Sequence, residues 1–210
     1  MKKIATLVAL LLILTGCAQG TTENAVEDGI PVKFFFVSDT PRGFKLFSEV
    51  QSWTAADDMN FQVVSDLVTG KVVPLDPEYA TLWGGTNTVN SVGIADSVAT
   101  VDLAEISLNV GAEGEQRAID QIVWTLTGND PSIKSVKFTV DGLVSESLAG
   151  HVDFAQTFTL APSYEVLASV WINLLDRSDV SNPVSISGSA CTFEANIAWE
   201  LSQGGEVKDS

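Results

Sequence analysis

Hydrophobic positions between residues 32 and 70 follow first a strand pattern and then a helix pattern. Val32–Val37 is a short run of apolar and aromatic residues, and Phe44–Val50 is a weaker run of the same kind. Both runs predict strands. Asp57-Asp58 precedes apolar residues at three- and four-residue spacing, which predicts a helix with an aspartate cap. Gly70 is expected to end that helix.

The next part of the chain predicts a hairpin, a long helix and a strand. Val89–Ile94 and Val98–Leu103 flank a short polar turn, which is typical of a β-hairpin. Ala112–Thr127 places its apolar residues on one stripe, and Gly128 is expected to stop the helix. Ser135–Val140 alternates as a strand does. Helices interleaved with few strands indicate an α+β fold, in which a small sheet is packed by two helices.

After about residue 161 the pattern contains strands but no helix. Thr192–Leu201 alternates apolar and polar residues, and Val184–Ser187 does so over a shorter stretch. Both are typical of a β-sandwich, which needs about 100 residues. Residues 166–210 are too few for this fold. They predict a partial β-sandwich.

The first residues have the layout of a secretory signal. Two lysines precede the apolar run Ile4–Leu14, which is too short to span a membrane. The run ends in Leu14-Thr15-Gly16-Cys17, which resembles the bacterial lipobox. We expect residues 1–16 to be removed, Cys17 to carry a diacylglyceryl group, and residues 17–31 to form a flexible tether. The alternative is an ordinary signal peptide with an incidental cysteine.

Charge and rare residues exclude several classes of protein. The chain has 11 basic and 27 acidic residues among 210, so its net charge is −16. This charge argues against binding to nucleic acid or to anionic lipid through the protein surface. The single histidine, His151, and the two cysteines, Cys17 and Cys191, exclude multi-histidine metal sites, Cys₄ zinc sites and a disulfide framework. No cofactor is expected.

Residues 32–158 resemble the GerMN domain of sporulation and spore-germination proteins. The resemblance is carried by Ala99–Leu103, by Gln121–Thr127 at the end of the long helix, and by Val136–Gly142. The sequence departs from the family at Lys71, where a Gly-Pro pair is more usual. The resemblance implies a small fold like those of ring-building proteins.

Residues 166–210 resemble the immunoglobulin-like Gmad domain that often follows GerMN. The resemblance is carried by Asn182–Val184, Ile186–Ala190 and Phe193–Ala195. The second half of the Gmad domain is missing from this sequence. Together the two resemblances imply an extracytoplasmic lipoprotein on the cell membrane. It would bind other envelope proteins, be linked to sporulation, germination or cell-wall processes, and have no established catalysis.

Motifs for catalysis or metal binding are missing from the sequence. It contains no HExxH, CxxC, GxGxxG, P-loop or Ser-x-x-Lys pattern, and no EF-hand loop. We interpret His151 as a surface or half-buried residue and Cys191 as a buried structural cysteine. Glu113 and Glu115 are interpreted as first-turn acids that the helix dipole favours.

Trp83 is the one aromatic residue that the pattern offers as a contact site. It lies in the long connection of residues 71–88, where an exposed indole could stack on a glycan or anchor a partner. The alternative is that it packs over the sheet. Trp124 and Trp199 lie in periodic elements and are expected in the core or at a contact between domains. Three functions remain: a scaffold for envelope proteins, a module that binds peptidoglycan, and a cell-wall hydrolase using two carboxylates.

Overall fold

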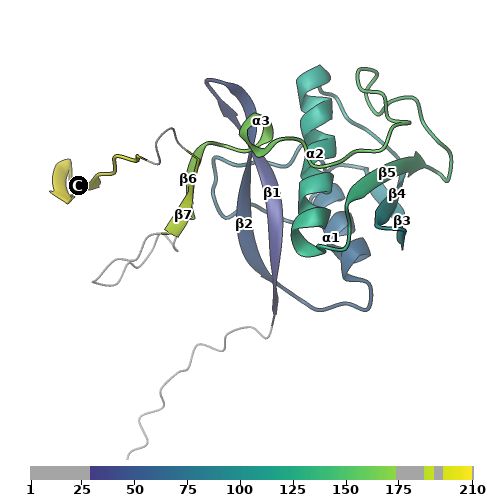
Figure 1. The fold of residues 1–210 in the computed structure, drawn as a ribbon, viewed down its shortest axis with the longest axis horizontal. Coiled ribbons are helices and arrows are strands. Elements are labelled where there is room, and N and C mark those ends of the chain that lie inside the picture. The colour runs from purple at the N-terminus through teal and green to yellow at the C-terminus, as the bar shows by residue number, and fades with distance from the viewer. Residues whose placement is uncertain (1–28, 174–186, 192–195, 210) are drawn as a thin grey trace, which may run out of the picture.

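The computed structural model describes residues 29–173, 187–191 and 196–209. Figure 1 shows the long helix α2 between a hairpin and a three-stranded sheet. The elements in chain order are β1 (Ile30–Thr40), β2 (Gly43–Trp53), α1 (Met59–Val68), β3 (Thr88–Ala95), β4 (Val98–Ala104), α2 (Ala112–Asn129), β5 (Ser135–Val140), α3 (Ser163–Val166), β6 (Val170–Asn173), β7 (Ser187–Ala190), β8 (Leu201–Gln203) and β9 (Glu206–Asp209).

Several predicted segments lie outside the described residues. They are the signal peptide, Cys17, the tether up to residue 28, Asn182–Val184 and Phe193–Ala195. The last residues assigned to the tether, Ile30 and Pro31, form the start of β1. None of the helices in the described ranges is long and apolar enough to cross a membrane.

The β1–β2 hairpin pairs without a break from Ile30 opposite Trp53 to Thr40 opposite Gly43. Its two faces enter different hydrophobic clusters because side chains alternate along a strand. Phe34 and Phe36 lie in the main core, whereas Phe35 joins a smaller cluster. The two predicted strands are therefore confirmed, and each is longer than its hydrophobic run.

The second sheet has the order β3-β4-β5. β3 pairs antiparallel with β4, and β4 pairs parallel with β5 across the α2 crossover. The expectation of one small sheet packed by two helices is wrong in this respect, since two small sheets lie on either side of α2 (Figure 1). The hairpin stays separate because α2 occupies the outer edge of β1.

Both predicted helices are present. Asp58 caps α1, since its side chain accepts a hydrogen bond from the backbone N–H of Phe61 at 2.9 Å. The apolar stripe of α2 is fully buried, with Ile119 and Ile122 each 0% exposed. The α+β class is confirmed.

Gly128 does not end α2, which continues to Asn129. A Cβ at Gly128 would lie 3.2 Å from Cε2 of Phe35, tighter than most contacts between side chains. This glycine therefore permits the helix to approach β1 closely. The helix stops before Pro131, whose ring disfavours helical backbone in the residue before it.

The described residues after α3 form two small antiparallel pairs, β6–β7 and β8–β9. The predicted strand over 192–201 is wrong for residues 196–200, which have no regular structure. Trp199 is 53% exposed there, so its expected place in a core is also wrong. The partial immunoglobulin-like sandwich stays a prediction.

Candidate functional site

The outer edge of β1 is closed by one polar stripe of α2. Asn129 Oδ1 accepts from the N–H of Lys33 at 2.9 Å, and Asn129 Nδ2 donates to the Lys33 carbonyl at 2.7 Å. Thr125 Oγ1 accepts from the N–H of Phe35 at 3.2 Å. Gln121 Nε2 donates to the Phe35 carbonyl at 2.9 Å. These three side chains are four residues apart, so they lie on the same face of the helix.

The chain itself closes the next position of this edge. Val37 and Ala80 exchange two backbone hydrogen bonds, each 2.8 Å long. The outward N–H and C=O groups of three alternate β1 residues are thus all bonded. No donor or acceptor remains for another strand at these positions.

The register of the hairpin determines where the backbone of β2 points. In an antiparallel pair, residues opposite each other direct their N–H and C=O groups either both inward or both outward. Ser48 lies opposite Phe35, and Val50 lies opposite Lys33. The backbone groups of Ser48 and Val50 therefore point away from β1, toward the outer edge of β2.

That outer edge is bonded at its first two outward positions, Phe44 and Leu46, and is open after them. The Leu46 carbonyl accepts from the N–H of Ala168 at 2.9 Å. Among the residues that the structure describes, no group bonds to the outward backbone of Ser48 or Val50. Side chains of α2 close the edge of β1, but nothing in the described chain closes this part of β2.

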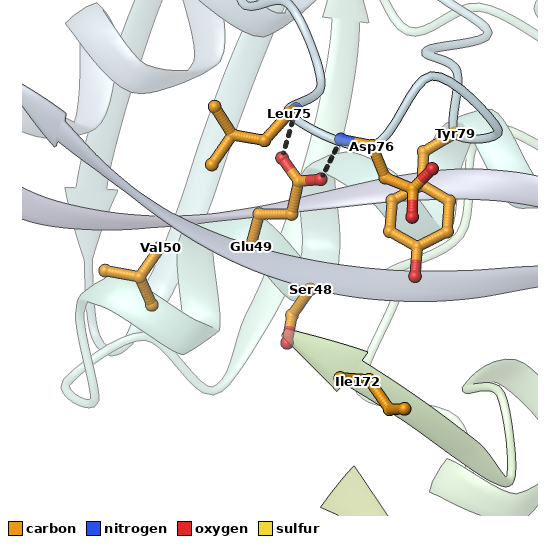
Figure 2. Close-up of a pocket in the computed structure, with 7 residues that line it drawn as sticks. All are labelled: Ser48, Glu49, Val50, Leu75, Asp76, Tyr79 and Ile172. Carbon is orange, nitrogen blue, oxygen red and sulfur yellow. Dashed lines mark hydrogen bonds between the residues drawn. The ribbon is translucent and has the colours of Figure 1, made fainter. Parts of the chain in front are cut away.

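A shallow groove runs along the open edge of β2 (Figure 2). We call it the β2-edge groove. One side is formed by the connection between α1 and β3, residues 71–87, and the other by β6. Its lining residues are Ser48, Glu49, Val50, Leu75, Asp76, Tyr79 and Ile172.

Glu49 fastens the connection to β2. Its two carboxylate oxygens accept from the N–H groups of Leu75 at 2.8 Å and Asp76 at 2.9 Å, as Figure 2 shows. The side chain of Gln51 donates to the same carboxylate at 3.0 Å. Tyr79 stacks on Phe47 with ring centroids 4.5 Å apart. These contacts give the groove a fixed wall.

The groove is both acidic and apolar. Burial, together with the negative charges of Asp76, Glu49 and Glu78, raises the pKa of Tyr79 to about 12. Three apolar side chains that line the groove are unusually exposed for their type: Val50 57%, Leu75 61% and Ile172 57%. Val73, in the same connection as Leu75, is 69% exposed. A contiguous exposed apolar surface of this kind marks an interaction site more often than an isolated apolar residue does.

Glu115 lies in the first turn of α2, as expected, and is also a buried anchor for a distant loop. Its side chain is 0% exposed. It accepts from the backbone N–H groups of Leu148, Ala149, His151 and Val152 at 2.8–3.2 Å. Burial raises the pKa of the carboxyl, but these hydrogen bonds outweigh burial and lower the pKa overall.

His151 belongs to the same anchor. Its Nδ1 lies 3.1 Å from Oε2 of Glu115, and its side chain is 43% exposed. The interpretation of His151 as a surface or half-buried residue is therefore confirmed in its first form, since the residue is exposed, but the sequence did not indicate its partner. No serine or cysteine nucleophile is hydrogen-bonded to the ring in the described part of the chain.

The structure places the other two candidate residues differently from expectation. Trp83 is 4% exposed and its Nε1 donates to the Ala118 carbonyl at 2.8 Å, so the indole has no free face for a glycan. The packing alternative is the one observed. Cys191 is an exposed free thiol, so its interpretation as buried is wrong. It lies just after the short strand β7, outside the hydrophobic clusters that the described residues form.

Carboxylates elsewhere are engaged in structural contacts. Asp102 accepts from Thr139 at 2.6 Å and from the N–H of Gly142 at 2.7 Å, and these bonds lower its pKa. Burial raises the pKa of Asp120, but this carboxyl is paired with Arg117 and lines neither the β2-edge groove nor the hollow beside β6 and β7. Within the described ranges, no group of three or more metal-binding side chains could hold an ion.

Solved structures share this fold at low sequence identity. The tandem GerMN domains of the sporulation protein GerM from Bacillus subtilis are 21% identical, with a TM-score of 0.50 over 60% of this chain and 45% of that one. This chain therefore matches less than half of the tandem protein's length. The first GerMN domain of GerM alone is 20% identical, with a TM-score of 0.49 over 60% of this chain and 96% of that one.

A further structure comes from Clostridium perfringens and bears the name "Putative Lipoprotein". It is 22% identical, with a TM-score of 0.44 over 62% of this chain and 87% of that one. A search of curated proteins found no match. Residues 33–146 match the family described as "Germane: Sporulation and spore germination". Since that match spans more than half of the chain, the protein belongs to the Germane, or GerMN, family.

Proposed function

We propose that this protein is a lipid-anchored scaffold of the bacterial envelope, which binds other envelope proteins and has no active site of its own. The observation that carries the proposal is the β2-edge groove, an open strand edge beside exposed apolar side chains. Exposed strand edges pair readily with partners. The family supports a role in sporulation or germination.

The anchor is part of the proposal and rests on Leu14-Thr15-Gly16-Cys17. Two acyl chains on Cys17 suffice for stable attachment to the membrane. Cys17→Ala should abolish lipid labelling and leave the precursor unprocessed or released. Membrane attachment of this variant at mature size would contradict the anchor.

The rival functions have weaker support. The glycan-binding role rested on an exposed indole at residue 83, and Trp83 is buried. A hydrolase needs two carboxylates around an open cleft. Glu49 and Asp76 line the β2-edge groove, but the Glu49 carboxylate is bonded to two backbone N–H groups and to the Gln51 amide of its own chain.

The decisive experiment has two arms. In the first, the full protein is cross-linked in its native membrane, and the captured proteins are compared with those captured by Cys17→Ala. We expect specific envelope proteins with the anchored form. In the second, the purified protein is incubated with peptidoglycan. Release of muropeptides, abolished by a single Asp or Glu substitution that preserves the fold, would overturn the proposal.

A further inference from the structure

The β2-edge groove has the backbone geometry that an added strand requires. Ser48 and Val50 direct their N–H and C=O groups outward, two residues apart, as in the ladder of a sheet. An extended peptide can bond to such an edge through its own backbone. The same hairpin uses this kind of bonding on its other edge, where Val37 pairs with Ala80.

The edge lacks the features that usually protect exposed strands. Natural edges are often blocked by lysine, proline or a bulge. Residues 48–52 read Ser-Glu-Val-Gln-Ser, and the register with β1 is unbroken there. The lysine of the hairpin in this region, Lys33, lies on the closed edge. The open edge is thus left free to pair.

The surroundings indicate which side chains the added strand would carry. Val50 and Ile172 are exposed on one side of the edge, and Leu75 is exposed on the other. An extended ligand with apolar residues at alternate positions would cover Val50 and Ile172 on the first side, while its other face would meet Leu75 and the connection. Asp76, Glu49 and Glu78 all act on Tyr79 as negative charges, and the whole chain carries −16. A basic ligand complements this field.

We infer that the β2-edge groove binds an extended segment of a partner protein that alternates apolar residues and carries Lys or Arg, by adding it as a strand to β2 at Ser48–Val50. This inference rests on the proposed function and deepens it, because it specifies the class of partner segment. The backbone of the segment bonds to the edge, and its basic side chain faces the carboxylates of the α1–β3 connection.

The test uses a fluorescent synthetic peptide that alternates valine and threonine and carries two lysines. Its binding to the full protein, carrying Cys17→Ala and purified in detergent, is measured by anisotropy. Val50→Pro removes an edge N–H that makes no bond within the hairpin. Val50→Ala is the matched control, since it keeps that N–H. We expect binding at least about tenfold weaker for Val50→Pro than for Val50→Ala.

Changes in the peptide test the same contacts without altering the protein. N-methylation of every amide in the alternating segment should abolish binding, because the peptide then loses all its backbone donors to the edge. Replacing both lysines by glutamate should weaken binding at least about tenfold. Three results would overturn the inference. They are binding of a modified peptide as tight as that of the original peptide, equal binding by the two Val50 variants, and no binding by the parent protein.

Two further results separate this inference from the proposed function. If Val50→Pro still captures the same envelope proteins as the parent, the groove is not the contact site, although the scaffold proposal stands. If the parent captures none, the scaffold proposal itself fails. Self-association of the protein that Val50→Pro abolishes would replace the partner segment by a second copy and would also overturn the inference.

Discussion

The two edges of the β1–β2 hairpin are treated in opposite ways, although the strands are equal in length and paired throughout. On β1, Gln121, Thr125 and Asn129 bond to the backbone as a neighbouring strand would. On β2, the outward groups at Ser48 and Val50 have no such partner in the described chain. A helix can therefore end a sheet on one side while the other side stays able to grow.

The two edges also differ in what satisfies their backbone donors and acceptors. The closed edge is buried, with Gln121 and Thr125 both 0% exposed, so every donor and acceptor there must be satisfied internally. The open edge lies at the surface, where water can satisfy the same groups. Changes on the closed edge should therefore affect folding, and changes on the open edge should affect binding.

The largest effect is expected from Gln121→Leu. This substitution leaves the Phe35 carbonyl and the Leu82 N–H without the partners they have at 2.9 Å. Two buried unsatisfied groups should lower the free energy of unfolding by about 2–5 kcal/mol. Urea denaturation measures the change, with Gln116→Leu on a less buried turn of α2 as control. Equal losses of unfolding free energy for the two variants would show that the contacts of Gln121 with the β1 edge do not stabilise the fold as proposed.

A second, smaller effect distinguishes the β1 edge, which neutral side chains close, from residues 148–152, which the Glu115 carboxylate holds. Lowering the pH should release residues 148–152 while the β1 edge stays protected, because amides and hydroxyls do not titrate. The pKa of Glu115 is lowered in the folded state, so its contribution is complete above the unfolded pKa and is lost as pH falls through the folded pKa. Hydrogen exchange of the Ala149 and Phe35 amides measures this difference.

Glu115→Gln should reproduce the acid effect at neutral pH. We expect a loss of about 1–3 kcal/mol, since a side-chain amide cannot accept from four N–H groups as a carboxylate does. Glu113→Gln, an exposed acid two residues earlier, is the control. If the loop amides stay protected in Glu115→Gln, the carboxylate does not hold the loop.

The smallest effect is expected on the open edge. Val50→Lys should change the free energy of unfolding by less than about 0.5 kcal/mol, because Val50 is 57% exposed. The same substitution at Val32 on β1, which is 2% exposed, should cost about 3 kcal/mol or more. Thermal unfolding of the pair tests whether the two strands differ as proposed. A large loss at Val50 would show that the edge is covered in solution.

Periodicity predicted most elements of the GerMN domain because each buries one apolar face. It did not predict the separate hairpin, since the closing residues are polar and lie at 121, 125 and 129, where a polar stripe is ordinarily exposed. The repeated four-residue spacing of Gln, Thr and Asn next to the apolar stripe was an available signal. The sequence contained no such signal for the role of Glu115, because its partners are backbone groups of a loop more than thirty residues away.

Of the groove, the sequence indicated only that the 71–88 connection could carry a contact residue. Finding it required the register of β1 against β2, which decides whether Ser48 points inward or outward. A shift of one residue would reverse that choice. Such register information depends on contacts distant in the chain and cannot be read from a local pattern.

The closed edge of β1 also determines how the protein responds to mechanical load. A pull on Ile30 along the strand axis acts on hydrogen bonds that run perpendicular to the strand, both toward β2 and toward α2. These bonds are loaded together in shear and do not open one after another. Tension that reaches the domain through its first strand is therefore shared with the long helix, and the hairpin resists being peeled from the core.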